Sequence, residues 1–181
     1  MKTKFLIIRF SSIGDIVLTS PVVRCLKTQF PEAEVHFLTK KRNADLLQAN
    51  PYIDQIQLLD NSLSDTIQRL KMENYDYIID LHNNLRSLRV KLGLKARSYS
   101  FNKLNFRKLL LTRLKLNTMP DRHIVDRNLE TIRPFNIVND GKGLEHFIPE
   151  EDEFPLSELP ESFRSGYVAL VLAGTYTTKR M

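Results

Sequence analysis

Short apolar runs alternate with helical stretches along the first hundred residues, and this alternation constrains the fold more than any other feature of the chain. The apolar runs begin near residues 4, 34, 55 and 75, and polar turns and amphipathic stretches separate them. Strands joined through helices pair in parallel, because each helix carries the chain back across the sheet. The sequence therefore predicts an α/β fold with a Rossmann-like, doubly wound parallel sheet.

The predicted elements follow from periodicity and from helix-breaking residues. We expect one long first helix, 15–30, which Pro21 should kink because proline removes a backbone hydrogen bond. The predicted strands cover residues 4–9, 34–39, 55–59, 75–81 and 96–101. The predicted helices cover residues 15–30, 41–49, 62–73, 85–92, 103–116 and 121–133.

The last third of the chain changes character. Residues 136–163 are rich in acidic residues and proline, which is typical of a connector, and a fresh apolar run begins at Tyr167. The sequence thus predicts a first domain over residues 1–135 and a linker over 136–166. Residues 167–181 would form the first strand and loop of a second, truncated domain.

Charge and composition limit the possible partners and compartments. From Leu81 to Pro120 there are ten Lys or Arg residues and no acidic residue, which predicts contact with an anionic partner. The single cysteine, Cys25, excludes a disulfide framework, and its apolar neighbours predict a buried thiol. No signal sequence or membrane-length apolar run is visible, so we expect a cytoplasmic protein.

The turn Ser11-Ser12-Ile13-Gly14-Asp15 follows the first strand, at the sheet edge where open α/β sheets bind ligands. Ser12 and Asp15 have capping-box spacing, which explains both residues without any chemistry. The alternative is a general base, since a helix N-terminus keeps a carboxylate ionised at neutral pH. Gly14 is expected in either case, to allow a sharp turn or the close approach of a ligand.

A second polar turn, His82-Asn83-Asn84, follows the fourth strand and leads to Arg86 and Ser87. These side chains could bind sugar hydroxyls and an anionic group, or could only cap a helix. The glycine spacing of a dinucleotide fingerprint and of a P-loop is absent, which disfavours an ordinary nicotinamide or ATP enzyme.

The stretch from Ile7 to Pro21 resembles the ADP-heptose:lipopolysaccharide heptosyltransferases, the bacterial glycosyltransferase family nine. Further similar pieces follow in the family's order: Leu26-Lys27, Phe30-Pro31, Asn50-Pro51-Tyr52-Ile53-Asp54, Asp80 to Ser87, Ala173-Gly174-Thr175 and Lys179-Arg180. One feature departs from the family pattern, in which Trp-Pro usually follows Lys-Arg, whereas Met181 stands there in this sequence.

The resemblance implies the N-terminal, acceptor-binding half of a two-domain GT-B glycosyltransferase. It implies inverting, metal-independent transfer of heptose from ADP-heptose to the lipopolysaccharide inner core, with no cofactor besides the nucleotide sugar. Asp15 would be the catalytic base. The implied acceptor-binding residues are Ser11, Ser12, Gly14, His82, Asn84, Arg86, Ser87 and Arg127. The implied donor-binding residues are Gly174, Thr175 and Lys179, and the chain by itself is expected to be inactive.

The implied partners are the lipid A–core acceptor, the anionic inner face of the inner membrane in peripheral contact, and the nucleotide sugar through a second domain. Nucleic acid is not expected under this interpretation. Two alternatives remain open at the level of the sequence. One is a non-catalytic module that binds anionic lipid or nucleic acid, and the other is a related glycosyltransferase with another sugar.

Overall fold

The computed structural model describes residues 2–101 and 122–168. The chain divides into two compact units, Met1–Ile148 and Pro149–Met181. The predicted helix 103–116 lies outside the described residues. The first unit contains both polar turns that the sequence singles out.

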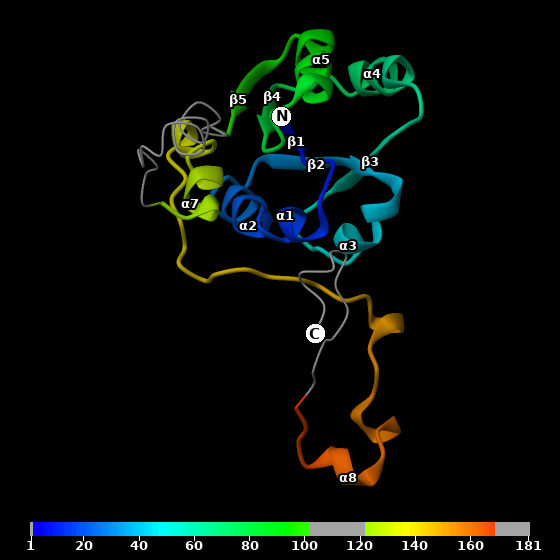
Figure 1. The fold of residues 1–181 in the computed structure, drawn as a ribbon. Coiled ribbons are helices and arrows are strands. Elements are labelled where there is room, and N and C mark those ends of the chain that lie inside the picture. Colours follow the sequence, from blue (N-terminus) through cyan, green and yellow to red (C-terminus); the bar gives the residue numbers. More distant parts are fainter. Residues whose placement is uncertain (1, 102–121, 169–181) are drawn as a thin grey trace, which may run out of the picture. The chain divides into compact units, whose positions relative to one another are not determined.

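The first unit is built on one parallel sheet of five strands (Figure 1). The strands are β1 (Thr3–Ile8), β2 (Ala33–Lys40), β3 (Gln55–Leu59), β4 (Tyr77–Asp80) and β5 (Arg97–Ser100). Their order is β3-β2-β1-β4-β5, and each pair is parallel. The direction of winding reverses between β1 and β4, so the topological switch point lies between these two neighbours. The predicted doubly wound sheet is confirmed.

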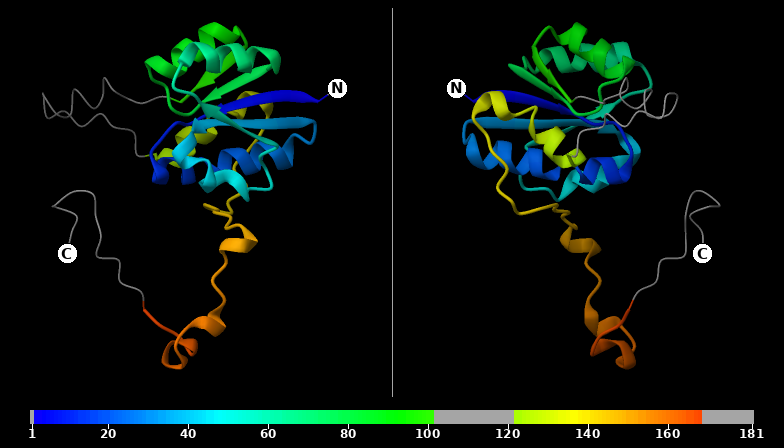
Figure 2. Two further views of the ribbon diagram at one scale, coloured as in Figure 1. Left: turned by 90° about the vertical axis from the view of Figure 1, so that its right-hand side faces the viewer. Right: turned by 60° about the vertical axis from the view of Figure 1, so that its left-hand side comes forward.

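Helices cover both faces of this sheet, as both views in Figure 2 show. One face carries α1 (Ile13–Val17), α2 (Ser20–Gln29), α3 (Asp45–Gln48) and α7 (Ile124–Leu129), and the other carries α4 (Leu63–Met72) and α5 (Leu85–Leu94). Short 3-10 turns at Lys41–Asn43 and Arg133–Phe135 complete the unit. Because side chains alternate along a strand, Phe5 and Ile7 pack in one hydrophobic cluster, while Leu6 and Ile8 pack in the other.

Two helix predictions were wrong in detail. The predicted single helix 15–30 is two helices, because Pro21 lies in the first turn of α2 instead of inside a longer helix. Proline suits that position, since the backbone N–H that it lacks would have no partner there. The predicted helix 121–133 is only α7, whose start is capped by His123 accepting the Val125 N–H at 3.3 Å.

The segment from Ile137 to Phe147, which the sequence assigns to a linker, packs on the first unit. The guanidinium of buried Arg24 on α2 binds the Asp140 carboxylate through two hydrogen bonds of 2.7 Å and pairs with Glu145 at 2.9 Å. Gln29 exchanges two hydrogen bonds with the Val138 backbone. The packed unit therefore ends at Ile148 and not at residue 135, because buried side-chain contacts hold a segment whose composition is typical of a connector.

The second unit is described as far as Val168. It contains 3-10 turns at Glu150–Asp152 and Leu156–Glu158 and the single-turn helix α8 (Glu161–Arg164). The predicted strand from Tyr167 and the donor-binding residues expected after it fall almost entirely outside the described residues. In the described ranges 2–101 and 122–168, no helix is long and apolar enough to cross a membrane.

Candidate functional site

The turn between β1 and α1 holds the Asp15 carboxylate in one position. Ser12 is the N-cap of α1 and Asp15 lies in its first turn. The Oδ2 atom of Asp15 accepts hydrogen bonds from the Ser12 backbone N–H at 3.1 Å and from the Ser12 hydroxyl at 2.9 Å. Ser12 and Asp15 therefore form the helix cap that their spacing predicts. Ser11 contributes its backbone carbonyl to the turn rather than its side chain.

Arg9 is the residue that the sequence argument did not assign. Its guanidinium lies 2.7 Å from Asp15 Oδ2 and donates to the Ser11 carbonyl at 3.0 Å. It also donates to the Leu81 carbonyl, which lies in the turn after β4. The residue is only 8% exposed, so this one cation joins the two polar turns across the switch point. The sequence feature that could have revealed Arg9 is the position of an arginine directly after a buried strand and shortly before a carboxylate.

These contacts leave the two oxygens of Asp15 in different states. Oδ2 receives all the contacts from Arg9 and Ser12, whereas Oδ1 accepts no hydrogen bond from any described residue. The side chain is 33% exposed. Partial burial raises the pKa of the Asp15 carboxyl, but the hydrogen bonds from Ser12 and Arg9 outweigh it, so that pKa lies below its ordinary value. The group is an ionised carboxylate whose Oδ2 is held in place and whose Oδ1 receives no hydrogen bond from the part of the chain that the structure describes.

Gly14 does not have the role that the sequence suggests. It lies inside α1 without a positive φ, and a Cβ placed on it would meet no atom within 4 Å. The turn itself therefore does not require glycine at this position. The sequence suggests two explanations for a glycine here. The need for a sharp turn is wrong, and the close approach of a ligand stays a prediction.

The turn after β4 is organised by a buried aspartate. Asp80 Oδ1 accepts the backbone N–H groups of His82 and Asn83 at 3.1 and 2.7 Å, and its Oδ2 lies 2.8 Å from Lys91 Nζ. The His82 ring packs against Phe10 with 5.0 Å between centroids. Half-buried His82 thus lies against the residue that precedes the Ser11–Asp15 turn, which brings the two predicted turns together.

Asn84 and Ser87 form a helix cap at the start of α5. The Asn84 side chain accepts the Ser87 N–H at 2.9 Å, and the Ser87 hydroxyl accepts the Asn84 N–H at 2.9 Å. Ser87 has no exposed surface, so its side chain shapes the helix start and is not placed to touch an acceptor. Arg86, between them, is exposed and lines a depression beside the residues that follow β2 and β3.

Arg127 reaches the same edge from α7. Its guanidinium lies over the Phe101 ring at 4.9 Å from the centroid. The Phe101 backbone N–H donates to the Asp80 carbonyl at 3.0 Å, and its carbonyl accepts from Asn83 at 2.8 Å. The structure therefore brings Arg127 to the turn after β4, where Phe101 contacts both Arg127 and Asn83. Gly174, Thr175 and Lys179 lie outside the described residues.

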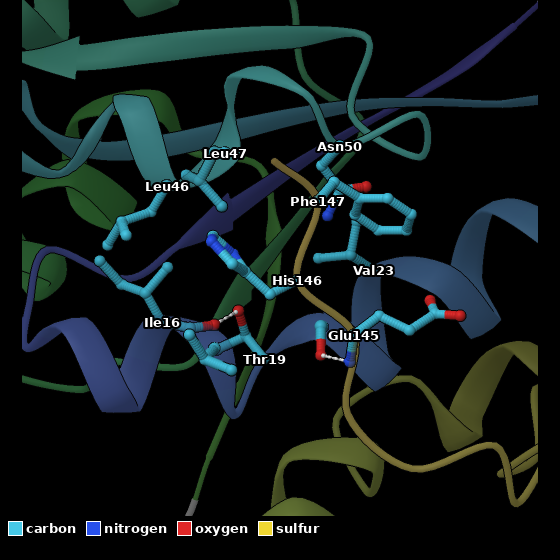
Figure 3. Close-up of a pocket in the computed structure, with 11 residues that line it drawn as sticks. Ile16, Thr19, Val23, Leu46, Leu47, Asn50, Glu145, His146 and Phe147 are labelled. Atoms are coloured by element: carbon cyan, nitrogen blue, oxygen red, sulfur yellow. Dashed lines mark hydrogen bonds between the residues drawn. The ribbon is translucent and has the colours of Figure 1, made fainter. Parts of the chain in front are cut away.

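A narrow crevice lies behind α1 and is closed by the residues that line it (Figure 3). The backbone of Glu145 donates to the Ser20 hydroxyl at 3.0 Å, and the Thr19 hydroxyl donates to the Ile16 carbonyl at 2.6 Å. Its volume of about 10 Å³ can hold no more than one water molecule. This crevice is a packing feature that anchors the 137–147 segment, so the candidate site lies at the open edge of the sheet.

No model of a known protein family matches the chain. The chain is 27% identical over 142 residues to lipopolysaccharide heptosyltransferase 3 of Escherichia coli strain K12, covering 70% of this chain and 40% of that protein. It is 27% identical over 106 residues to lipopolysaccharide heptosyltransferase 1 of Campylobacter coli, covering 55% of this chain and 31% of that protein. The chain thus spans less than half the length of the curated relatives that it matches.

Solved structures agree on the fold. A glycosyl transferase of family 9 from Veillonella parvula superposes with a TM-score of 0.65 at 18% identity, covering 82% of this chain and 46% of that one. The Escherichia coli heptosyltransferase WaaC, solved with ADP-2-deoxy-2-fluoro heptose, superposes with a TM-score of 0.60 at 17% identity, covering 78% and 51%. The chain therefore has the Rossmann-like fold of about half of a GT-B glycosyltransferase, and its sequence resembles the lipopolysaccharide heptosyltransferases of family nine.

Proposed function

We propose that the chain is the acceptor-binding half of an inverting glycosyltransferase that moves heptose from ADP-heptose to the lipopolysaccharide inner core. The observation that carries this proposal is the state of Asp15 at the switch point of the sheet, where three donor groups fix Oδ2 and no described residue donates a hydrogen bond to Oδ1. Similarity to curated heptosyltransferases supports the sugar and the acceptor.

In the proposed reaction, Asp15 Oδ1 takes the proton of an acceptor sugar hydroxyl as its oxygen attacks the anomeric carbon of the donor heptose. The bond between that carbon and the diphosphate oxygen breaks, and ADP leaves with the electron pair. Arg9 acts as a positioning residue, because it holds the other carboxylate oxygen and keeps the base ionised. No metal ion or cofactor is part of this proposal.

A base with a lowered pKa is ionised at neutral pH but is a weak proton acceptor. General-base help of this kind is worth about 10²–10⁴-fold in rate, and a weak base should fall toward the lower end. Because the chain spans less than half of its relatives' length, we propose that transfer needs a donor-binding domain as well. The residues assigned to the donor by the resemblance are Gly174, Thr175 and Lys179.

The test is Asp15→Asn in the protein that the gene encodes, with heptose transfer from ADP-heptose to a lipid A–core acceptor as the readout. Asparagine keeps the size of the side chain and can still accept from Ser12, so we expect a fall in kcat of about 10²-fold or more. Asp65→Asn is the matched control, because Asp65 is also the third helix residue after a serine cap, Ser62. Near-normal transfer by Asp15→Asn would contradict the assignment of the base.

We also propose peripheral contact between α5 and an anionic membrane surface. Three leucines on this helix are exposed by 79%, 44% and 67%, namely Leu85, Leu88 and Leu92. Exposed Arg86 and Arg89 lie on the same helix, and residues 81–101 contain no acidic residue. Apolar side chains flanked by arginines suit an anionic bilayer. Sedimentation with anionic and neutral vesicles tests the contact, and equal binding to both would contradict it.

A further inference from the structure

A basic depression of about 420 Å³ lies at the carboxyl ends of β2 and β3. It is distinct from the Asp15 turn and from the closed crevice behind α1. Its lining residues are Lys40, Lys41, Arg42, Leu59, Asp60, Asn61, Leu63 and Arg86. Four of them are cations, and they come from β2, the following 3-10 turn and the first turn of α5.

The charge of this depression is not balanced by the protein. Among the described residues, none of its four cations takes part in an ion pair or a side-chain hydrogen bond. The one carboxylate in the lining, Asp60, is 2.9 Å from the guanidinium of Arg69, outside the lining. Other cations on this unit are paired, such as Lys91 with Asp80 and Arg24 with Asp140. Four like charges left together repel one another, so a ligand that brings negative charge would be stabilised there.

The depression lies beside the candidate site. The Asn43 side chain, in the same 3-10 turn as Lys41 and Arg42, donates to the Phe10 carbonyl at 2.9 Å. Phe10 immediately precedes the Ser11–Asp15 turn, and β2 is the neighbour of β1 in the sheet. A ligand whose reacting hydroxyl lies at Asp15 could therefore extend along the edge of the sheet into the depression.

We propose that this depression binds an oxyanion, a phosphate or carboxylate group, that is carried by the acceptor glycan. The inference rests on the proposed function and extends it to a second contact that fixes which acceptor hydroxyl meets Asp15. Lysines supply compact charges, while Arg42 and Arg86 can each bind an oxyanion through two parallel N–H groups. Free phosphate and the diphosphate of a nucleotide share this chemistry, so the experiment has to separate the sources.

Calorimetry on the chain of residues 1–181 compares three probes: a deacylated lipid A–core oligosaccharide, inorganic pyrophosphate and ADP. The variant is Lys41→Gln with Arg42→Gln, two exposed side chains whose loss should leave the fold intact, as circular dichroism checks. Lys71→Gln is the matched control, an exposed lysine on α4 outside the lining. We expect the double variant to bind the oligosaccharide about 10–100-fold more weakly, and the control to change it by less than about twofold.

The other possible results separate three questions: whether the site exists, whether its ligand is the acceptor, and whether the proposed function holds. Equal weakening by Lys71→Gln would overturn the site, because only overall charge would then matter. No weakening by the double variant would also overturn it, because Lys41 and Arg42 would then not contact the oligosaccharide. Pyrophosphate or ADP binding as tightly as the oligosaccharide, and competing with it, would overturn the assignment to the acceptor. If the folded chain binds no oligosaccharide but loses pyrophosphate binding in the double variant, the oxyanion site stands and the proposed function fails.

Discussion

Replacing Arg24 by methionine is expected to lower the free energy of unfolding of the Met1–Ile148 unit by about 2–3 kcal/mol. Arg24 is buried and donates two hydrogen bonds to Asp140, donates a third to the Gly143 carbonyl and pairs with Glu145. Removing one partner of a fully buried ion pair costs about 3–5 kcal/mol. The cost should be smaller here, because the side chains of Asp140 and Glu145 are 18% and 30% exposed and can regain water.

The pH dependence of this loss identifies its cause. The hydrogen bond from Arg24 is the largest of the effects that hold the pKa of the Asp140 carboxyl well below its usual range. A group whose pKa is lowered by folding stabilises the protein above its unfolded value, about 3.9, and this contribution is lost as the pH falls toward the folded value. The difference between wild type and Arg24→Met should therefore be full at pH 7 and shrink below about pH 4.

Urea denaturation at pH 7 and near pH 3.5 measures both quantities, with Arg89→Met as the control because Arg89 is exposed on α5. A loss of 2–3 kcal/mol corresponds to a fall in melting temperature of about 4–10 °C for a unit of this size. A difference below about 0.5 kcal/mol at pH 7 would refute the reasoning, since that is the range of ordinary surface substitutions. A loss that does not change with pH would show that packing, and not the ion pair, is responsible.

Two further predictions concern single side chains. Ser87→Ala should destabilise the first unit by about 1–2 kcal/mol, because the buried hydroxyl that accepts the Asn84 N–H is lost, and chemical denaturation beside exposed Ser64→Ala checks this value. An equal effect of both variants would contradict the capping role. Burial raises the pKa of the Cys25 thiol, so its reaction with a thiol reagent at pH 8 should be at least about 100-fold slower in the native protein than in urea. A native rate close to the unfolded one would show that α2 exposes this residue.

The fold was predictable because its signals are local. Apolar runs such as Phe5 to Ile8 must be buried on both faces, and they fixed four strands to within about two residues at each end. The split of the first helix was not predicted, since Pro21 is compatible both with a kink and with a helix start. The choice depends on the chain between Val17 and Ser20, which has no distinctive sequence signature.

The candidate site was predictable only in part. Asp15 was found because its position after a strand and its capping spacing are visible in the sequence. Arg9 was missed, because its importance depends on reaching Leu81, far away in the chain and adjacent in the sheet. The pairing of Arg24 with Asp140 and Glu145 is likewise a contact over more than a hundred residues. Contacts of that kind depend on the completed fold and leave no periodic pattern.

The anchoring of residues 137–147 determines where a following domain could pivot. A hinge needs backbone that is free of side-chain contacts, and the bonds to Arg24 and Gln29 remove that freedom as far as Ile148. Any domain motion would therefore turn about Pro149 and the residues after it, several residues later than the composition suggests. Arg24 therefore sets where the free connecting segment begins, and its loss would lengthen that segment by freeing residues 137–147.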